Sequence, residues 1–199
     1  MNIETLLALS LFSFVTSITP GPNNIMLLAS GINFGFRKTL PHSFGVSIGF
    51  LIMLVAVGLG VGALIQSSPM VYSILKYFGI IYLFWLAWKT TISHSIAQTN
   101  NQEIKPLTFL GAALFQWINP KAWMMAVSGM AMYTNTISPY LSMLQVAVIF
   151  AAINWPCVAI WAMFGSKLRE RLKQPKTLKR FNLVMGVLLA LSGISVLFQ

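Results

Sequence analysis

Six long apolar stretches make up most of this 199-residue chain. A helix needs roughly 20 mainly apolar residues to cross a bilayer, and each stretch reaches that length. The links between them leave no room for a separate soluble domain. We therefore predict a single all-α integral membrane domain over residues 1–199, with spans near 5–31, 43–65, 70–91, 107–133, 139–164 and 178–198.

The charged residues agree with this prediction in number and in placement. They are only 8% of the chain, against about 25% in soluble domains. The net charge of +10 would suit nucleic acid, but basic residues fill alternate loops, as the positive-inside rule requires. We predict no nucleic-acid partner, both termini outside the cytoplasm, and basic cytoplasmic loops carrying Arg37, Lys38, Lys89, Lys105 and the seven Lys and Arg residues of 167–180.

Two of the apolar stretches are interrupted by proline, glycine and asparagine. The first is broken at 19–24 and the fourth at 119–121. Gly21 permits unusual backbone angles, and Pro22 suits the first position of a new helix. A break within hydrocarbon leaves polar backbone groups that must face protein or a water-filled cavity. At 1.5 Å per residue the two breaks lie about 22 and about 20 Å into their spans from opposite sides of a core of about 30 Å, so they approach each other near the middle of the membrane.

Matched positions in the two halves suggest an inverted repeat. Ile18-x-Pro20 aligns with Ile118-x-Pro120, and Leu75-Lys76-x-Phe78 aligns with Leu178-Lys179-x-Phe181. Three spans per unit would insert the second unit in the opposite sense, the plan of many transporters whose broken helices mark the binding site. We predict repeats at about 1–91 and 107–199 joined by a cytoplasmic loop at 92–106, with chance alignment of apolar sequence as the alternative.

The two breaks offer complementary groups to a zwitterion. New helices that begin near Pro22 and Lys121 expose N–H groups suited to a carboxylate, and the ends near Ile18 and Ile118 expose carbonyls suited to an ammonium group. A simple proline kink is the alternative. We predict substrate binding by Thr19, Pro20, Gly21, Pro22, Asn23, Asn24, Asn119, Pro120 and Lys121.

Lys121 is the basic residue predicted deepest in a span, and an intramembrane charge is costly enough to indicate function. It could pair with the substrate carboxylate or change protonation, or it could snorkel or bind freed carbonyls. Trp117 and Trp123 flank it and could stack on an ammonium group or simply pack. Asn154 precedes Pro156 in the fifth span, where it could satisfy freed carbonyls or touch substrate.

Missing residue types narrow the function further. The acidic residues Glu4, Glu103 and Glu170 all fall at ends or in loops, so the predicted spans lack the carboxylates that metal export or acid–base catalysis requires. His42 and His94 fall in or beside predicted cytoplasmic loops, which indicates interfacial positions. We predict that the protein is not an enzyme and uses no metal or cofactor.

Several motifs resemble a known family. Thr19-Pro20-Gly21-Pro22, Gly35-Phe36-Arg37 and Asn119-Pro120-Lys121 resemble the lysine and threonine/homoserine exporters, the LysE/RhtB family. Residues 19–25 and 86–89 look most like its cysteine/O-acetylserine exporters. The resemblance implies amino-acid efflux across the bacterial inner membrane, driven by protons. Many members carry an acidic residue just after Pro-Gly-Pro, whereas this chain has Asn23, so the proton carrier is unassigned.

Together these observations predict a secondary exporter of small neutral amino acids of the cysteine, O-acetylserine, threonine or homoserine class, working by proton antiport. Its partners would be the substrate and the lipid bilayer, and a homo-oligomer is compatible with the sequence. The alternative is a non-transporting membrane subunit or assembly module.

Overall fold

The computed structural model describes residues 1–60, 69–91, 106–135, 137–169 and 174–197. Within these ranges every regular element is a helix, as the sequence predicted. Helices α3 and α8 are each long and apolar enough to cross a membrane, and α1 and α2 together pass the same test as one span bent by 55°. The elements are α1 (Ile3–Ile18), α2 (Pro22–Phe34), α3 (Phe36–Gly58), α5 (Pro69–Thr91), α6 (Phe109–Phe115), η1 (Gln116–Ile118), α7 (Pro120–Tyr133), α8 (Pro139–Leu168) and α9 (Pro175–Leu197).

The helix boundaries follow local sequence signals. Asn2 caps α1 by accepting a hydrogen bond from the Thr5 N–H, and Thr108 caps α6 in the same way through Gly111. Proline occupies the first turn of α2, α7 and α8, where its missing N–H costs nothing. One prediction was wrong in detail. Helix α3 begins at Phe36 rather than 43, because Gly35 at a φ of 82° turns the chain directly from α2 into α3 and places Arg37 and Lys38 in its first turn.

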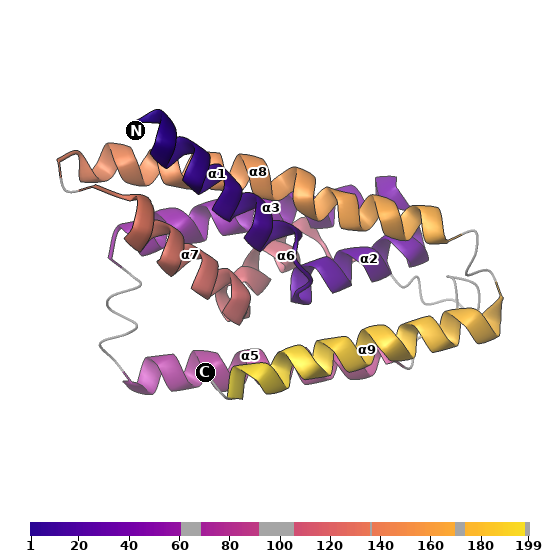
Figure 1. The fold of residues 1–199 in the computed structure, drawn as a ribbon. Coiled ribbons are helices and arrows are strands. Elements are labelled where there is room, and N and C mark those ends of the chain that lie inside the picture. Colours follow the sequence, from indigo (N-terminus) through magenta and orange to yellow (C-terminus); the bar gives the residue numbers. More distant parts are fainter. Residues whose placement is uncertain (61–68, 92–105, 136, 170–173, 198–199) are drawn as a thin grey trace.

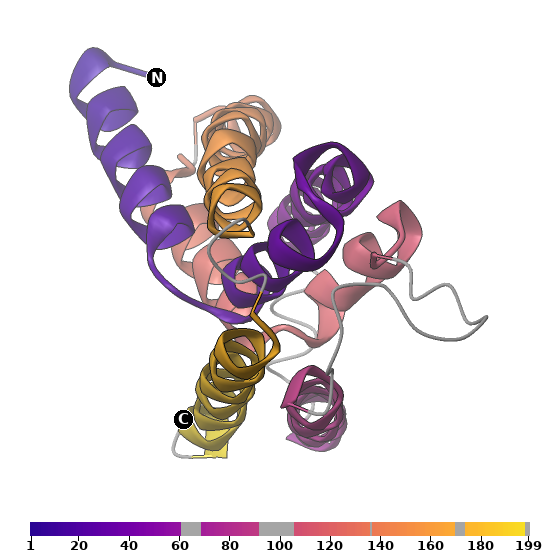
Figure 2. The same cartoon turned by 90° about the vertical axis from the view of Figure 1, so that its right-hand side faces the viewer.

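The helices form a larger bundle and a separate pair (Figures 1 and 2). Helix α8 runs along the bundle and packs against α1, α2 and α3, while α6 packs on α3. Helices α5 and α9 lie side by side and run in opposite directions below the bundle in Figure 1. The pair meets the bundle through α2 and η1, each of which borders one of the helix breaks.

Buried side chains hold the bundle and the pair together. Phe150 of α8 is fully buried and makes edge contacts with Phe12 and Phe50, at ring-centroid distances of 5.8 and 5.1 Å. A second cluster joins Ile25 and Leu28 of α2 to α5 and α9. The outer faces carry exposed apolar side chains such as Leu7 and Ile81, 63% and 67% exposed, which suits contact with lipid.

Glycines let two helix pairs come into backbone contact. A Cβ atom at Gly45 or Gly49 of α3 would overlap the backbone of α6, and one at Gly31 of α2 or Gly165 of α8 would overlap the partner helix. Gly45 and Gly49 lie four residues apart on α3 and form a flat strip that lets the α6 backbone approach closely.

Candidate functional site

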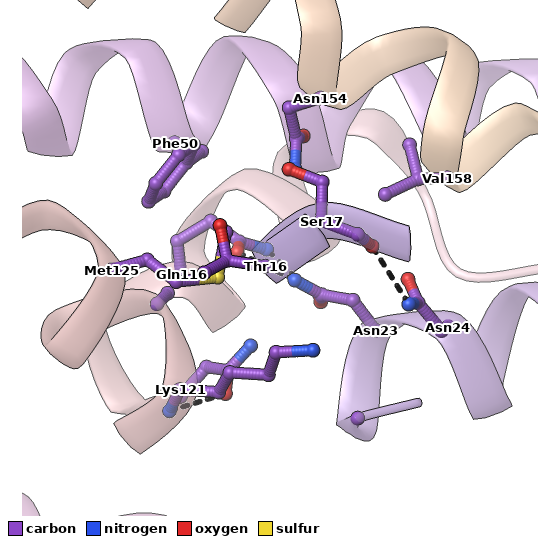
Figure 3. Close-up of a pocket in the computed structure, with 13 residues that line it drawn as sticks. Thr16, Ser17, Asn23, Asn24, Phe50, Gln116, Lys121, Met125, Asn154 and Val158 are labelled. Atoms are coloured by element: carbon purple, nitrogen blue, oxygen red, sulfur yellow. Dashed lines mark hydrogen bonds between the residues drawn. The ribbon is translucent and has the colours of Figure 1, made fainter. Parts of the chain in front are cut away.

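Both predicted breaks are present, and a cavity lies where they meet (Figure 3). Its volume is about 20 Å³, which is room for one or two water molecules and too little for an amino acid. Asn154, Ser17 and Phe50 border it on the side of α8, α1 and α3. The lining residues are Thr16, Ser17, Gly21, Asn23, Asn24, Phe50, Gln116, Asn119, Lys121, Ala122, Met125, Asn154 and Val158.

The Lys121 side chain crosses from one break to the other. Its Nζ donates to the carbonyl oxygen of Thr19 at 2.6 Å, to the Thr19 hydroxyl at 3.0 Å and to the carbonyl oxygen of Pro20 at 3.4 Å. The lysine thus binds the carbonyls freed at the end of α1, one of the alternatives left open by the sequence. Of the residues that the structure describes, Glu4 is the only acidic one, and it lies exposed in the first turn of α1.

Gly21 leaves space for the Lys121 side chain, a role that the sequence did not predict. Its φ of −171° and ψ of 177° are extended angles that any residue adopts, so the expectation of unusual backbone angles was wrong. A Cβ atom at Gly21 would instead lie 2.6 Å from Cδ of Lys121. Any other residue here would displace the lysine, because the aliphatic part of Lys121 passes over the backbone at this point.

Other carbonyls at the end of α1 have side-chain partners as well. The Asn24 amide, 3% exposed, donates to the carbonyls of Ser17 at 2.9 Å and of Thr19 at 2.7 Å (Figure 3). The Trp161 indole of α8 donates to the carbonyl of Ile18 at 3.1 Å. Each carbonyl in 17–20 therefore receives a side-chain donor from α2, α7 or α8, which satisfies the freed end of α1.

The second break is satisfied mainly by its own residues. Helix α6 continues as the 3-10 turn η1, and the side chain of Asn119 accepts a hydrogen bond from the Lys121 N–H at 3.2 Å as the N-cap of α7. Trp123 donates to the carbonyl of Trp117 at 2.8 Å, and the two rings meet edge to face at 6.1 Å. The two tryptophans therefore pack on each other, the second of the alternatives considered for them.

Gln116, which the sequence analysis did not single out, connects the two breaks. Its amide is fully buried and exchanges two hydrogen bonds with the Asn23 amide, at 2.8 and 3.2 Å. It also donates to the carbonyl of Ala112 in its own helix. Glutamine in an apolar stretch one turn before Asn119-Pro120 was the signal available in the sequence, because a buried amide needs a partner.

Asn154 lines the opposite wall of the cavity and belongs to a short chain of hydrogen-bonded polar side chains. Its Nδ2 donates to the Ser17 hydroxyl at 3.0 Å, and its Oδ1 accepts from the Ser47 hydroxyl at 3.0 Å. Both ends of the amide are thus engaged across α1, α3 and α8 rather than by carbonyls freed at Pro156. Its contact with the cavity agrees with the alternative that it touches substrate.

The structure divides the nine predicted site residues into two groups. Gly21, Asn23, Asn24, Asn119 and Lys121 line the cavity. The remaining four are absent from its wall: Thr19 and Pro20 supply the oxygens that bind Lys121, while Pro22 and Pro120 are the first residues of α2 and α7.

The interfacial position predicted for His42 was wrong. Its side chain is 1% exposed within α3, and among the described residues neither ring nitrogen has a hydrogen-bond partner. The prediction failed because α3 starts seven residues before the apolar stretch, so that His42 is part of the helix and is buried in the protein. His94 lies outside the described residues. Within the described part of the chain, no group of three or more His, Cys, Asp or Glu side chains is placed to hold a metal ion.

Comparison with known proteins identifies the family. The sequence matches the family described as LysE type translocator over residues 14–199. The chain belongs to this family. Proteins named cysteine/O-acetylserine efflux protein in Escherichia coli K12 and Shigella flexneri are each 29% identical to it over 189 residues, 94% of this chain and 94% of theirs. No solved structure gives a significant match.

Family membership agrees with the architecture. The resemblance stated from the sequence is confirmed, and with it the assignment of the chain as a transmembrane transport protein. The breaks and the cavity between them are thus features of a translocator.

Proposed function

We propose that this protein is a secondary transporter that exports small neutral amino acids across the bacterial inner membrane in exchange for protons. The main support is the cavity, in which the two helix breaks meet the middle of α3 and α8. Its wall offers amide, hydroxyl and backbone groups and one ammonium group, a combination that suits a small zwitterion. The relatives named for cysteine and O-acetylserine efflux place these two compounds first among the substrates to test.

Transport requires the cavity to enlarge. At about 20 Å³ it cannot hold an amino acid, and the reciprocal Asn23–Gln116 bond draws α2 and η1 together across it. We propose that this amide pair separates when substrate enters, because both amides can then exchange their mutual bonds for bonds to substrate. Alternating access in transporters of this type is largely motion of one bundle against another around a fixed site.

We further propose six spans in two inverted repeats, with α1–α2 corresponding to α6–α7, α3 to α8, and α5 to α9. The antiparallel pairing of α5 with α9 supports this correspondence. The start of α1 and the end of α9 lie toward one end of the molecule, while the α2–α3 turn and the end of α8 lie toward the other (Figure 1). The latter end carries Arg37, Lys38 and Lys167, so it would face the cytoplasm.

The function is tested by transport with purified protein alone in liposomes. Labelled cysteine, O-acetylserine, threonine and homoserine are loaded in turn, and an imposed pH gradient drives exchange. We expect faster release of at least one compound than from protein-free liposomes, and acceleration by the gradient. Release of none of them would overturn the proposal in favour of a non-transporting subunit, and release unaffected by the gradient would overturn the antiport.

The orientation is tested by labelling. The chain has one cysteine, Cys157, which is buried. In a Cys157→Ser background, a cysteine introduced at Asn135 should react with a membrane-impermeant thiol reagent added to whole cells, whereas one introduced at Lys176 should react only after lysis. The reverse pattern would overturn the proposed orientation.

A further inference from the structure

The environment of the Lys121 ammonium group has the chemistry of an ammonium-binding site. A primary ammonium carries three donors and no acceptor, and here it faces three oxygens, two from Thr19 and one from Pro20, at 2.6, 3.0 and 3.4 Å. These oxygens lie at the C-terminal end of α1, where the helix dipole favours a cation. Thr19 and Pro20 are exposed, and Lys121, which binds their oxygens, lines the cavity, so these oxygens border the proposed substrate site.

The Lys121 ammonium group has no anionic partner among the described residues. No carboxylate of the described residues forms an ion pair with it, because Glu4 lies at the far end of α1. Its charge is balanced by neutral oxygens alone, in a segment where an unpaired charge is costly. Its long side chain spans the break above Gly21 without being enclosed there, since it is only half-buried.

Resting on the proposed function, we propose that Lys121 occupies the site for the substrate's ammonium group and is displaced by it. When a zwitterion enters, its ammonium takes the oxygens of Thr19 and Pro20, and the released Lys121 pairs with its carboxylate. The exchange conserves charge at the break, because one primary ammonium replaces another. It also gives the lysine the anionic partner that the described residues do not provide.

This exchange explains selection for zwitterions. An amine without a carboxylate would displace Lys121 and leave it without an anion. A carboxylate without an amine would draw Lys121 away and leave the oxygens of Thr19 and Pro20 without a donor. Only a molecule with both groups satisfies both sides, and an unpaired group on either side is penalised.

The test measures binding of methylammonium to purified protein as a rise in melting temperature with ligand concentration. Replacing the lysine by methionine (Lys121→Met) removes the competing ammonium but keeps an unbranched side chain. We expect the half-saturating methylammonium concentration to fall about tenfold relative to the unmodified protein, the value of one hydrogen bond to a charged group. Tetramethylammonium, which has no N–H donor, should stabilise neither protein.

Gly21→Ala is the second variant, because it keeps the lysine and blocks its path. The new Cβ would lie 2.6 Å from Lys121 Cδ, so the side chain must shift, its bonds to the oxygens of Thr19 and Pro20 weaken, and methylammonium should again bind more tightly. This variant decides the result if Lys121→Met does not fold. Lys167→Met, a change at an exposed lysine near the end of α8, is the matched control and should bind methylammonium as the unmodified protein does.

The outcomes separate the exchange from a purely structural lysine. Opposite effects, tighter methylammonium binding and weaker amino-acid binding in Lys121→Met, support the exchange, because loss of a structural contact would weaken both. Unchanged or weaker methylammonium binding in both variants overturns it, and the proposed function then stands if the unmodified protein transports in liposomes. If the unmodified protein transports no amino acid, the proposed function fails and the exchange with it.

Discussion

The two helix breaks share a sequence pattern and satisfy their backbones in opposite ways. At the first, Gly21 offers no capping side chain, and the carbonyls of 17–20 depend on Lys121, Asn24 and Trp161. At the second, the turn η1 and the Asn119 cap use residues of the break itself. A break that takes two of its three donors, Lys121 and Trp161, from distant segments can release them, whereas a break that uses its own residues acts as a support. We infer that the first break changes during transport and the second positions Lys121 and Gln116 against it.

Replacing Lys121, the cation that joins the two breaks, should have the largest effect on efflux. In Lys121→Ala the oxygens of Thr19 and Pro20 lose a charged donor worth about 1.5–3 kcal/mol, and the proposed partner of the substrate carboxylate disappears. We expect efflux from liposomes to fall at least about tenfold, with normal membrane insertion. Lys167→Ala should transport at the unmodified rate. Unchanged efflux in Lys121→Ala would mean that the first break does not depend on the second.

Asn24→Ala should come next. It removes the hydrogen bonds to the carbonyls of Ser17 and Thr19; Thr19 keeps Lys121 as a donor, but the carbonyl of buried Ser17 loses its partner, at a cost of about 1–3 kcal/mol. We expect a lower melting temperature and strongly reduced efflux. Asn33→Ala is the control, because Asn33 donates only to the carbonyl of Ala29 within its own helix, and efflux should persist. Equal losses in the two variants would contradict a special role for the first break.

The amide pair between the breaks should give a measurable coupling energy. Asn23→Ala and Gln116→Ala each leave the other amide without its partner, so the double variant should be less destabilised than the sum of the single ones. For residues in direct contact we expect a coupling of about 0.5–3 kcal/mol, measured by denaturant unfolding in detergent. Additive effects would show that the pair does not join the two breaks.

The smallest effect is expected at the self-contained break. Asn119→Ala removes the α7 cap and should cost about 0.5–2 kcal/mol of stability, seen as a lower melting temperature with a smaller loss of efflux than in Lys121→Ala. Asn119→Asp, which keeps an acceptor at the cap, should restore part of the loss. A loss of efflux as large as in Lys121→Ala would end the distinction between a changing and a supporting break.

The fold was predictable wherever apolar length or a helix-breaking residue decided it. The all-helical class and both breaks follow from the spacing of proline, glycine and asparagine, because these residues act locally. The start of α3 was missed, since a positive φ at Gly35 lets a helix begin with the polar residues Arg37 and Lys38. Hydropathy marks where lipid-compatible sequence begins, which is not where hydrogen bonding begins.

The site was predictable in its members but not in their pairing. Asn23, Asn24, Asn119 and Lys121 stood out as polar groups near the breaks, and all four line the cavity. Their partners come from positions that local sequence does not connect. Gln116 bonds a residue 93 positions away, and Lys121 bonds one 102 positions away. Such pairings depend on how α2 and η1 pack, so they required the structure.

The glycine contacts between α2 and α8 have a mechanical consequence. At Gly31 and Gly165 the two backbones touch with no room for a side chain. Helices in such direct contact cannot move past one another without first separating, so we expect α2 and α8 to move together as one rigid unit during transport. The 55° bend between α1 and α2 is then the hinge at the end of this rigid unit. A single added methyl group at Gly31 or Gly165 would weaken the contact between α2 and α8 at a position outside the cavity wall.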